Sequence, residues 1–154
     1  MTLTTAIAFA LALVGREPDG LRRYVAAVLA ATDDEAEQRV LIVVARHENY
    51  FHLHAETSGT PPFGLTDREV RLGLPRASIE ASAVIARDSL RYLHGVCGSW
   101  SAALGRYHHG VRTGPRGELH GCWADALARR EAQEAIGPDE LDVATLDDVI
   151  ARSY

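Results

Sequence analysis

Apolar residues recur at intervals of three or four along most of the chain, which is the spacing of one face of a helix. In the N-terminal part this pattern predicts helices over residues 3–14, 21–31 and 33–48. The third segment follows Thr32 and a run of acidic residues. Such residues are typical of a helix start, because they satisfy backbone N–H groups and favour the positive end of the helix dipole. We therefore expect Thr32 to cap this helix.

The later part of the chain shows the same periodicity. The predicted helices of this part cover residues 75–95, 99–107, 122–136 and 138–151. The first of them begins at Pro75 and is expected to stop at Gly95. Glycine, proline and polar residues predict loops over 55–66 and 108–121. We expect an all-α fold, with at most a short irregular β element near residues 52–66.

Composition limits the classes of protein that the chain can represent. Its 154 residues favour a single domain, and 47% apolar with 24% charged residues is the mixture of a folded globule. Acidic residues outnumber basic ones by 21 to 16, and all sixteen basic residues are arginine. The formal charge of −5 argues against a dedicated nucleic-acid-binding module, whose binding surface is basic.

Two features leave alternatives open. The apolar run over residues 3–14 is either a first core helix or a secretion leader; its flanks favour the helix, because no basic residue precedes the run and no small-x-small cleavage site closes it. Cys97 and Cys122 are too few for a disulfide scaffold or a four-cysteine zinc site. They form either one disulfide or two buried thiols.

Glu48 is the first candidate for chemistry. It follows Val40 and Val44 at intervals of four, so it extends the apolar stripe of its helix instead of the solvent face. A carboxyl group that is partly withdrawn from water there suits a general acid. The alternative is a last-turn glutamate that turns out to water.

Three short motifs surround and follow Glu48. The glutamate stands in the segment VVARHENYF, Phe63-Gly64-Leu65-Thr66 follows, and the segment ALGRYHHG covers residues 103–110. In this order and at these separations, the motifs resemble the superfamily of lytic transglycosylases and goose-type lysozymes, which cleave peptidoglycan. The resemblance covers roughly residues 36–112 and implies one lysozyme-like domain over residues 1–154, with a motif-bearing core at about 33–112 and C-terminal helices at 122–151.

The resemblance implies a role for each matching residue. Glu48 would be the catalytic acid and then the base, and Tyr107 would support it or the substrate's N-acetyl group from across a cleft. The expected substrate-binding residues are Asn49, Phe63, Gly64, Leu65, Thr66, Tyr107 and His108. The implied reaction breaks the β-1,4 bond between N-acetylmuramic acid and N-acetylglucosamine, and it requires no cofactor and no metal. Asp67 is the one nearby carboxylate if a second one takes part.

The motifs also depart from the family pattern. Asn49 stands in place of the usual serine, Thr66-Asp67 in place of Met/Trp-Gln, and His108-His109 in place of the common Asn-Ala. These differences motivate an alternative, a catalytically silent relative that binds glycan or serves as a structural component of a phage particle. A histidine-ligated metallohydrolase is a third, weaker hypothesis, because Phe51 occupies the position of the second histidine in an H-E-x-x-H motif.

The acidic charge bears on delivery. An anionic cell wall attracts basic proteins, whereas a chain with a formal charge of −5 is mildly repelled. We therefore expect synthesis in the cytoplasm and delivery to the wall or a virion by a partner or lysis system, with peptidoglycan strands as the substrate and no membrane span.

Overall fold

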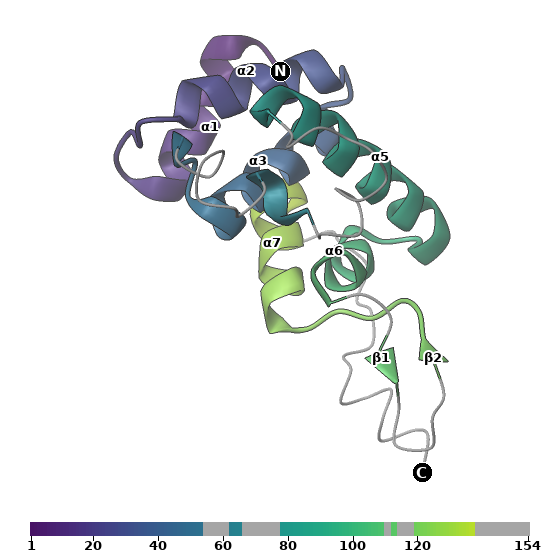
Figure 1. Ribbon diagram of the computed structural model, residues 1–154. Coiled ribbons are helices and arrows are strands. Elements are labelled where there is room, and N and C mark those ends of the chain that lie inside the picture. Colours follow the sequence, from purple (N-terminus) through teal and green to yellow (C-terminus); the bar gives the residue numbers. More distant parts are fainter. Residues whose placement is uncertain (54–61, 66–77, 110–111, 114–118, 138–154) are drawn as a thin grey trace. The chain divides into compact units, whose positions relative to one another are not determined.

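The computed structural model describes residues 1–53, 62–65, 78–109, 112–113 and 119–137 (Figure 1). The helices are α1 (Leu3–Val14), α2 (Leu21–Ala31), α3 (Glu35–Asn49), the 3-10 turn η2 (Pro62–Gly64), α5 (Ile79–Cys97), α6 (Trp100–His109) and α7 (Ala126–Ile136). Strands β1 (Arg112–Thr113) and β2 (Leu119–His120) form a two-residue antiparallel pair. The all-α expectation is confirmed. The small β element lies in the loop predicted at 108–121, and the described part of 52–66 holds a 3-10 turn.

The chain divides into two compact units, Met1–Asp88 and Ser89–Tyr154, and the boundary falls within α5. The expected motif-bearing core at 33–112 spans this boundary, and the single-domain organisation stays a prediction. The predicted helix at 138–151 lies outside the described residues. No helix in the described ranges is both long and apolar enough to cross a membrane.

In the first unit, α1, α2 and α3 pack against one another (Figure 1). The α1 helix buries Ala6 and Ala10, which lie one turn apart. In α3 every residue from Val40 to Ala45 is buried. This stretch is longer than one helical turn and is apolar on all sides, so the middle of α3 forms the centre of this unit. This places Glu48 at the end of a firmly held helix.

The observed helix ends correct two predictions. Asp34, and not Thr32, caps α3: its carboxylate accepts a hydrogen bond from the Glu37 backbone N–H, while the Thr32 hydroxyl donates to the Glu37 carboxylate at 2.6 Å. The α5 helix continues past Gly95 to Cys97, because the left-handed backbone that ends a helix occurs at Gly98, with φ +75°.

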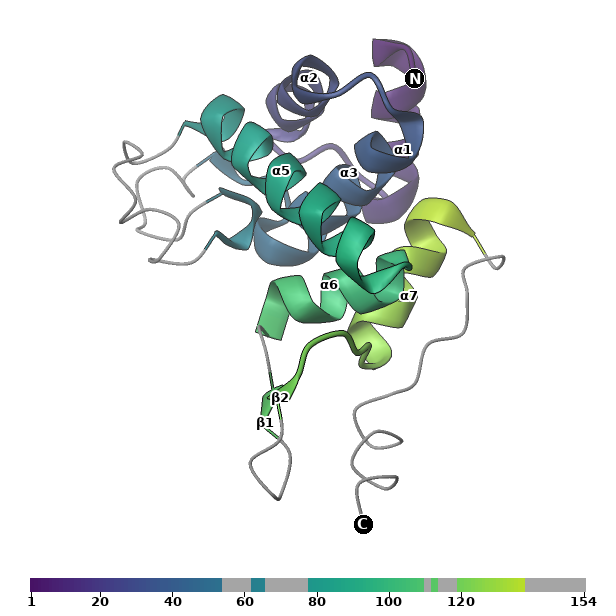
Figure 2. The ribbon, with the colours of Figure 1, turned by 90° about the vertical axis from the view of Figure 1, so that its right-hand side faces the viewer.

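The beginning of α5 is described as Ile79, not Pro75. Ser78 precedes it, and its hydroxyl accepts a hydrogen bond from the Ala81 backbone N–H, as a helix cap does. Pro75 itself lies outside the described residues. Helix α5 covers 19 residues. Figure 2 shows this helix along its length.

Polar contacts attach the first part of α5 to α2. The Arg23 guanidinium donates two hydrogen bonds to the Glu80 carboxylate, at 2.9 and 3.1 Å. These bonds, with a backbone hydrogen bond at the helix start, lower the pKa of the Glu80 carboxyl to about 2. The Arg87 guanidinium also donates to the carbonyl of Ala31, at the end of α2. Ionic and hydrogen-bonded contacts therefore hold α5 beside α2.

In the second unit, α6 packs against α7 and the segment that precedes it. A Cβ atom at Gly105 would overlap the backbone carbonyl of Trp123, so only glycine permits this close approach. Helix α7 begins at Ala126, four residues later than predicted, because the Asp125 carboxylate caps it by accepting from the Ala128 backbone N–H. A disulfide joins Cys97 to Cys122, which resolves the two alternatives for these cysteines.

Loss of the Cys97–Cys122 disulfide is expected to destabilise the second unit. The bond joins residues with a sequence separation of 25. A crosslink over a loop of this size lowers the entropy of the unfolded chain, which raises the free energy of unfolding by about 3 kcal/mol. Chemical denaturation of a Cys97→Ala/Cys122→Ala variant should show this loss. A reducing agent should destabilise the parent chain by the same amount and leave the variant unchanged; equal stability of parent and variant would contradict the expectation.

Candidate active site

Glu48 lies half-buried in the last turn of α3, and the turn η2 lies directly against it. A Cβ atom built on Gly64 would overlap the Glu48 carboxyl group and would lie only 2.8 Å from its Cγ. Gly64 also has φ +66°, a backbone conformation that side chains disfavour. Two independent reasons therefore require glycine at this position. The structure brings together Glu48 and the Gly64 turn, two elements of the predicted site.

Strained backbone surrounds this pair. Among the described non-glycine residues, positive φ angles occur at Tyr50 (55°), Phe51 (59°) and Phe63 (61°). Tyr50 and Phe51 follow Glu48 by two and three positions, and Phe63 precedes Gly64. Each such residue costs of order 1–3 kcal/mol and persists only where surrounding contacts impose it, which is common at functional sites. The strain therefore points to the same place as the motifs.

Tyr24 is the residue that holds the two strained turns together. Its side chain is fully buried, and its ring contacts Phe51 and Phe63 with centroid distances of 5.8 and 5.4 Å. Its hydroxyl accepts a hydrogen bond from the Asn49 side-chain amide at 2.8 Å. The side-chain oxygen Oδ1 of Asn49 in turn accepts a hydrogen bond from the Phe51 backbone N–H at 3.1 Å. One tyrosine from α2 thus fixes the chain on both sides of the Glu48–Gly64 contact.

Replacement of Tyr24 by phenylalanine is expected to loosen these turns while the apolar packing remains. The Asn49 amide would lose its acceptor, which costs about 1–2 kcal/mol in the free energy of unfolding. Thermal or urea unfolding should show this loss. Tyr92→Phe is the matched control, because Tyr92 is 66% exposed and should change stability little. Equal stability of Tyr24→Phe and the parent would contradict the role given to the hydroxyl.

The remaining predicted residues of the turn support it from within. Phe63 is 0% exposed and Leu65 is 3% exposed, so their side chains lie in the core. Contact of Phe63 with a saccharide would therefore involve its backbone. The Asn49 side-chain amide donates to the Tyr24 hydroxyl of α2, and its oxygen accepts from the Phe51 backbone N–H, so both ends of the amide have protein partners. Thr66 and Asp67 lie outside the described residues, and substrate binding by the turn stays a prediction.

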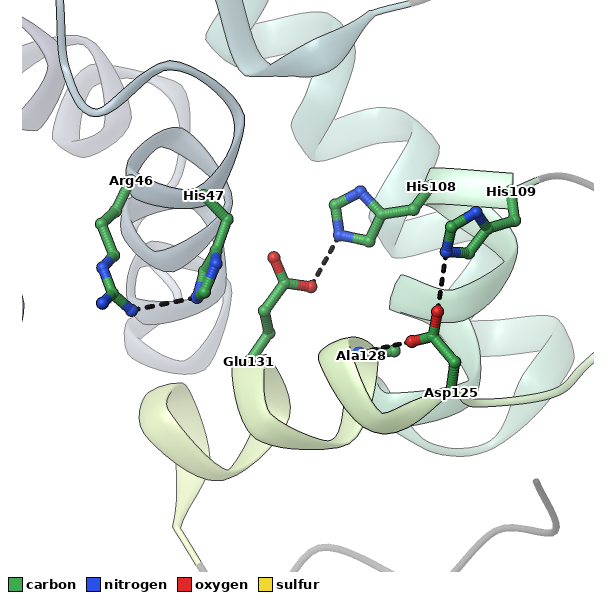
Figure 3. Close-up of polar contacts among 7 residues, drawn as sticks. All are labelled: Arg46, His47, His108, His109, Asp125, Ala128 and Glu131. Carbon is green, nitrogen blue, oxygen red and sulfur yellow. Dashed lines mark hydrogen bonds and ion pairs between the residues drawn. The ribbon is translucent and has the colours of Figure 1, made fainter. Parts of the chain in front are cut away.

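The other predicted residues, Tyr107 and His108, lie near the end of α6 in the second unit. His108 Nε2 donates a hydrogen bond to the Glu131 carboxylate at 2.6 Å, and the two side chains are only 6% and 0% exposed (Figure 3). The neighbouring His109 donates to Asp125 at 2.8 Å (Figure 3). Two adjacent histidines of α6 thus bind two carboxylates at α7, and the contacts observed for His108 are structural.

Truncation of His108 to alanine is expected to destabilise the second unit by about 3 kcal/mol, because the buried Glu131 carboxylate would lose its partner. Denaturant unfolding measures this effect. The control is His109→Ala, whose pair with Asp125 is partly exposed and contributes less. Unchanged stability of His108→Ala would contradict the structural role and favour a role in substrate binding alone.

The histidines near Glu48 have other partners. The side chains of His47 and Arg46 lie in contact, with 3.0 Å between Nε2 and Nη1 (Figure 3). His52 Nδ1 lies 3.4 Å from the Asp19 carboxylate. His54 lies outside the described residues. Within the described part of the chain, no three histidine, cysteine or acidic side chains gather to hold a metal ion.

Two residues that make these contacts, Tyr24 and Glu131, were not predicted from the sequence. Tyr24 lies on the apolar stripe of α2, where its hydroxyl needs a buried partner. Glu131 lies on a stripe with the buried Ala128 and Ala135, at intervals of three and four residues, which place the three side chains on one helix face. A polar side chain on an apolar helix face was the available signal in both cases.

Comparison with protein-family models, with curated proteins and with solved structures finds no match to the chain.

Proposed function

We propose that the chain is a glycosidase that cleaves the β-1,4 bond between N-acetylmuramic acid and N-acetylglucosamine in peptidoglycan, with Glu48 as its catalytic residue. The observation that carries the proposal is the contact between the Glu48 carboxyl and Gly64. The half-buried glutamate at the end of α3 lies against the glycine turn. The resemblance to lytic transglycosylases and goose-type lysozymes assigns the catalytic acid to the first of these elements and the lining of the sugar site to the second. The strained residues Tyr50, Phe51 and Phe63 support a functional role for the same place.

In the proposed reaction a single carboxyl group acts twice. Glu48 in its protonated form donates a proton to the glycosidic oxygen, the bond from C1 to that oxygen breaks, and the substrate's N-acetyl oxygen stabilises the cation at C1. The Glu48 carboxylate then removes the proton of the C6 hydroxyl, whose oxygen attacks C1 and closes a 1,6-anhydro ring. Attack by water in place of this hydroxyl gives the hydrolysis product of a lysozyme. Neither outcome needs a second carboxylate.

The hydrogen bonds around Glu48 support this role by fixing its position. Asn49, the next residue, is held by Tyr24 and by the Phe51 backbone. The Glu48 backbone therefore has little freedom. Its carboxyl group lies against the backbone of Gly64, which has no Cβ atom to displace it. A general acid must be held within hydrogen-bond reach of the proton acceptor, so such restraint favours catalysis.

The second candidate is a catalytically silent relative that binds glycan or serves in a phage particle. The contacts of Asn49 favour it, because the amide that replaces the usual serine is hydrogen-bonded to Tyr24 and to the Phe51 backbone. The two candidates differ in turnover.

Incubation of the purified chain with purified sacculi tests these candidates. A glycosidase should release soluble glycan fragments continuously, whereas a silent relative should sediment with the sacculi and release nothing. We also propose that a partner or lysis system delivers the chain to the wall. Addition of the chain to the outside of intact cells, compared with its addition to cells whose membrane is permeabilised, would test this proposal. Sacculi that neither bind the chain nor dissolve would contradict the glycosidase and the glycan-binding relative, and would favour a structural component of a phage particle.

A further inference from the structure

A depression of about 310 Å³ lies in the first unit, on the loop between α1 and α2. Its lining residues are Arg16, Glu17, Pro18, Asp19, Tyr50 and His52. This volume is at the lower end of the roughly 300–1,000 Å³ of small-molecule sites. Four of the six residues precede the segment of about 36–112 that resembles the glycosidases, so the resemblance gives this depression no role.

The walls of the depression are held in place. The Tyr50 hydroxyl donates a hydrogen bond to the Val14 carbonyl at 3.0 Å, which anchors the ring. The His52 ring lies beside it, with 5.9 Å between centroids and 35° between planes. A Cβ atom at Gly20 would overlap the Phe51 carbonyl, so the loop and the turn after α3 are closely packed. The depression therefore combines an aromatic wall with a fixed backbone.

The charges in the depression nearly cancel. Glu17 accepts two hydrogen bonds from Arg22, at 2.6 and 3.3 Å, and Asp19 lies against His52. The guanidinium of Arg16 has no partner among the residues that the structure describes. The two carboxylates disfavour an anion and the Arg16 guanidinium disfavours a cation, because each ligand would face a like charge. A neutral ligand with many hydroxyl groups is able to donate to the carboxylates and accept from the guanidinium.

We propose that this depression binds a saccharide unit, with the apolar face of the sugar on Tyr50 and its hydroxyl groups on Arg16 and Asp19. An aromatic ring buries a large apolar area at low entropic cost, and charged partners form the stronger hydrogen bonds to hydroxyl groups. That the saccharide belongs to peptidoglycan rests on the proposed function. The preference for a neutral sugar rests on the depression itself. Since Tyr50 follows Glu48 by two residues, a bound sugar would lie on the turn that follows the proposed catalytic residue.

Titration of the Glu48→Gln chain with the trimer of N-acetylglucosamine tests this proposal without turnover. Backbone amide NMR signals of Arg16, Glu17, Asp19, Tyr50 and His52 should shift with the sugar. The Arg16→Ala/Asp19→Ala variant should bind at least roughly tenfold more weakly, which is the loss expected for a single hydrogen bond to a charged group. Arg130→Ala is the control, because Arg130 is an exposed arginine of α7 that pairs with Glu134.

Three results would overturn the proposal. They are unmoved amide signals at residues 16, 17, 19, 50 and 52, equal affinity of the Arg16→Ala/Asp19→Ala variant, and stronger shifts of these signals with inorganic phosphate than with the sugar. Shifts confined to residues 63–65 would overturn it and leave the proposed cleavage intact. Conversely, a chain that binds the sugar at the depression but dissolves no sacculi would retain this site and lose the proposed activity.

Discussion

The Glu48→Gln chain is expected to cleave sacculi roughly 10²–10⁴-fold more slowly than the parent, which is the usual contribution of a positioned general acid. Glutamine has nearly the size of glutamate, so the contact with Gly64 should remain. Its amide cannot give a proton to the glycosidic oxygen or remove one from the C6 hydroxyl. The initial rate of release of soluble fragments from labelled sacculi measures the effect.

Glu35→Gln is the matched control for this substitution. Glu35 lies in the first turn of the same helix, and its exposed carboxylate pairs with Arg39 at 2.9 Å. An exposed pair of this kind contributes less than about 1 kcal/mol, so both the rate and the stability of Glu35→Gln should stay close to those of the parent. Equal rates for Glu48→Gln and the parent would exclude Glu48 as the catalytic residue.

The Gly64→Ala chain is expected to lose at least about 100-fold in cleavage rate, because the new methyl group would occupy the space of the Glu48 carboxyl. A displacement of a catalytic group by about 1 Å is sufficient for a loss of this size. Alanine at φ +66° also strains the backbone by of order 1–3 kcal/mol. Rates on sacculi and the free energy of unfolding should be measured on the same preparation.

Gly15→Ala separates the two effects. Gly15 has φ +75°, but a Cβ atom there would have no neighbour within 4 Å. This variant should therefore lose stability through backbone strain and retain the parent cleavage rate. If Gly64→Ala cleaves as fast as Gly15→Ala, the contact between Gly64 and Glu48 has no part in catalysis.

Helix periodicity was sufficient to predict the fold class. It was not sufficient to predict the residues at which each helix begins and ends. Segments 3–14 and 21–31 match α1 and α2, since their apolar residues repeat without interruption. The ends of other helices were less certain because neighbouring residues compete for one role. Thr32 and Asp34 both suit a cap, and Gly95 and Gly98 both suit a helix end. Tertiary contacts decide between such residues.

The candidate site was predictable in part. The spacing of Val40, Val44 and Glu48 predicted a carboxylate on the buried side of a helix, and the motifs predicted the Gly64 turn beside it. The contacts of Tyr24 with Asn49 and of His108 with Glu131 join residues 25 and 23 positions apart. Local patterns carry no information on such pairs, because the packing of separate helices creates them.

The most direct measurement of the central claim is mass spectrometry of the fragments that the parent chain releases from purified sacculi, with the Glu48→Gln chain analysed in parallel. We predict new N-acetylmuramic acid ends in the parent digest, either 1,6-anhydro or reducing, and none above background with Glu48→Gln. Intact glycan strands after the parent digest, cleavage of peptide bonds alone, or the same new ends from both chains would contradict the claim that Glu48 catalyses glycosidic cleavage.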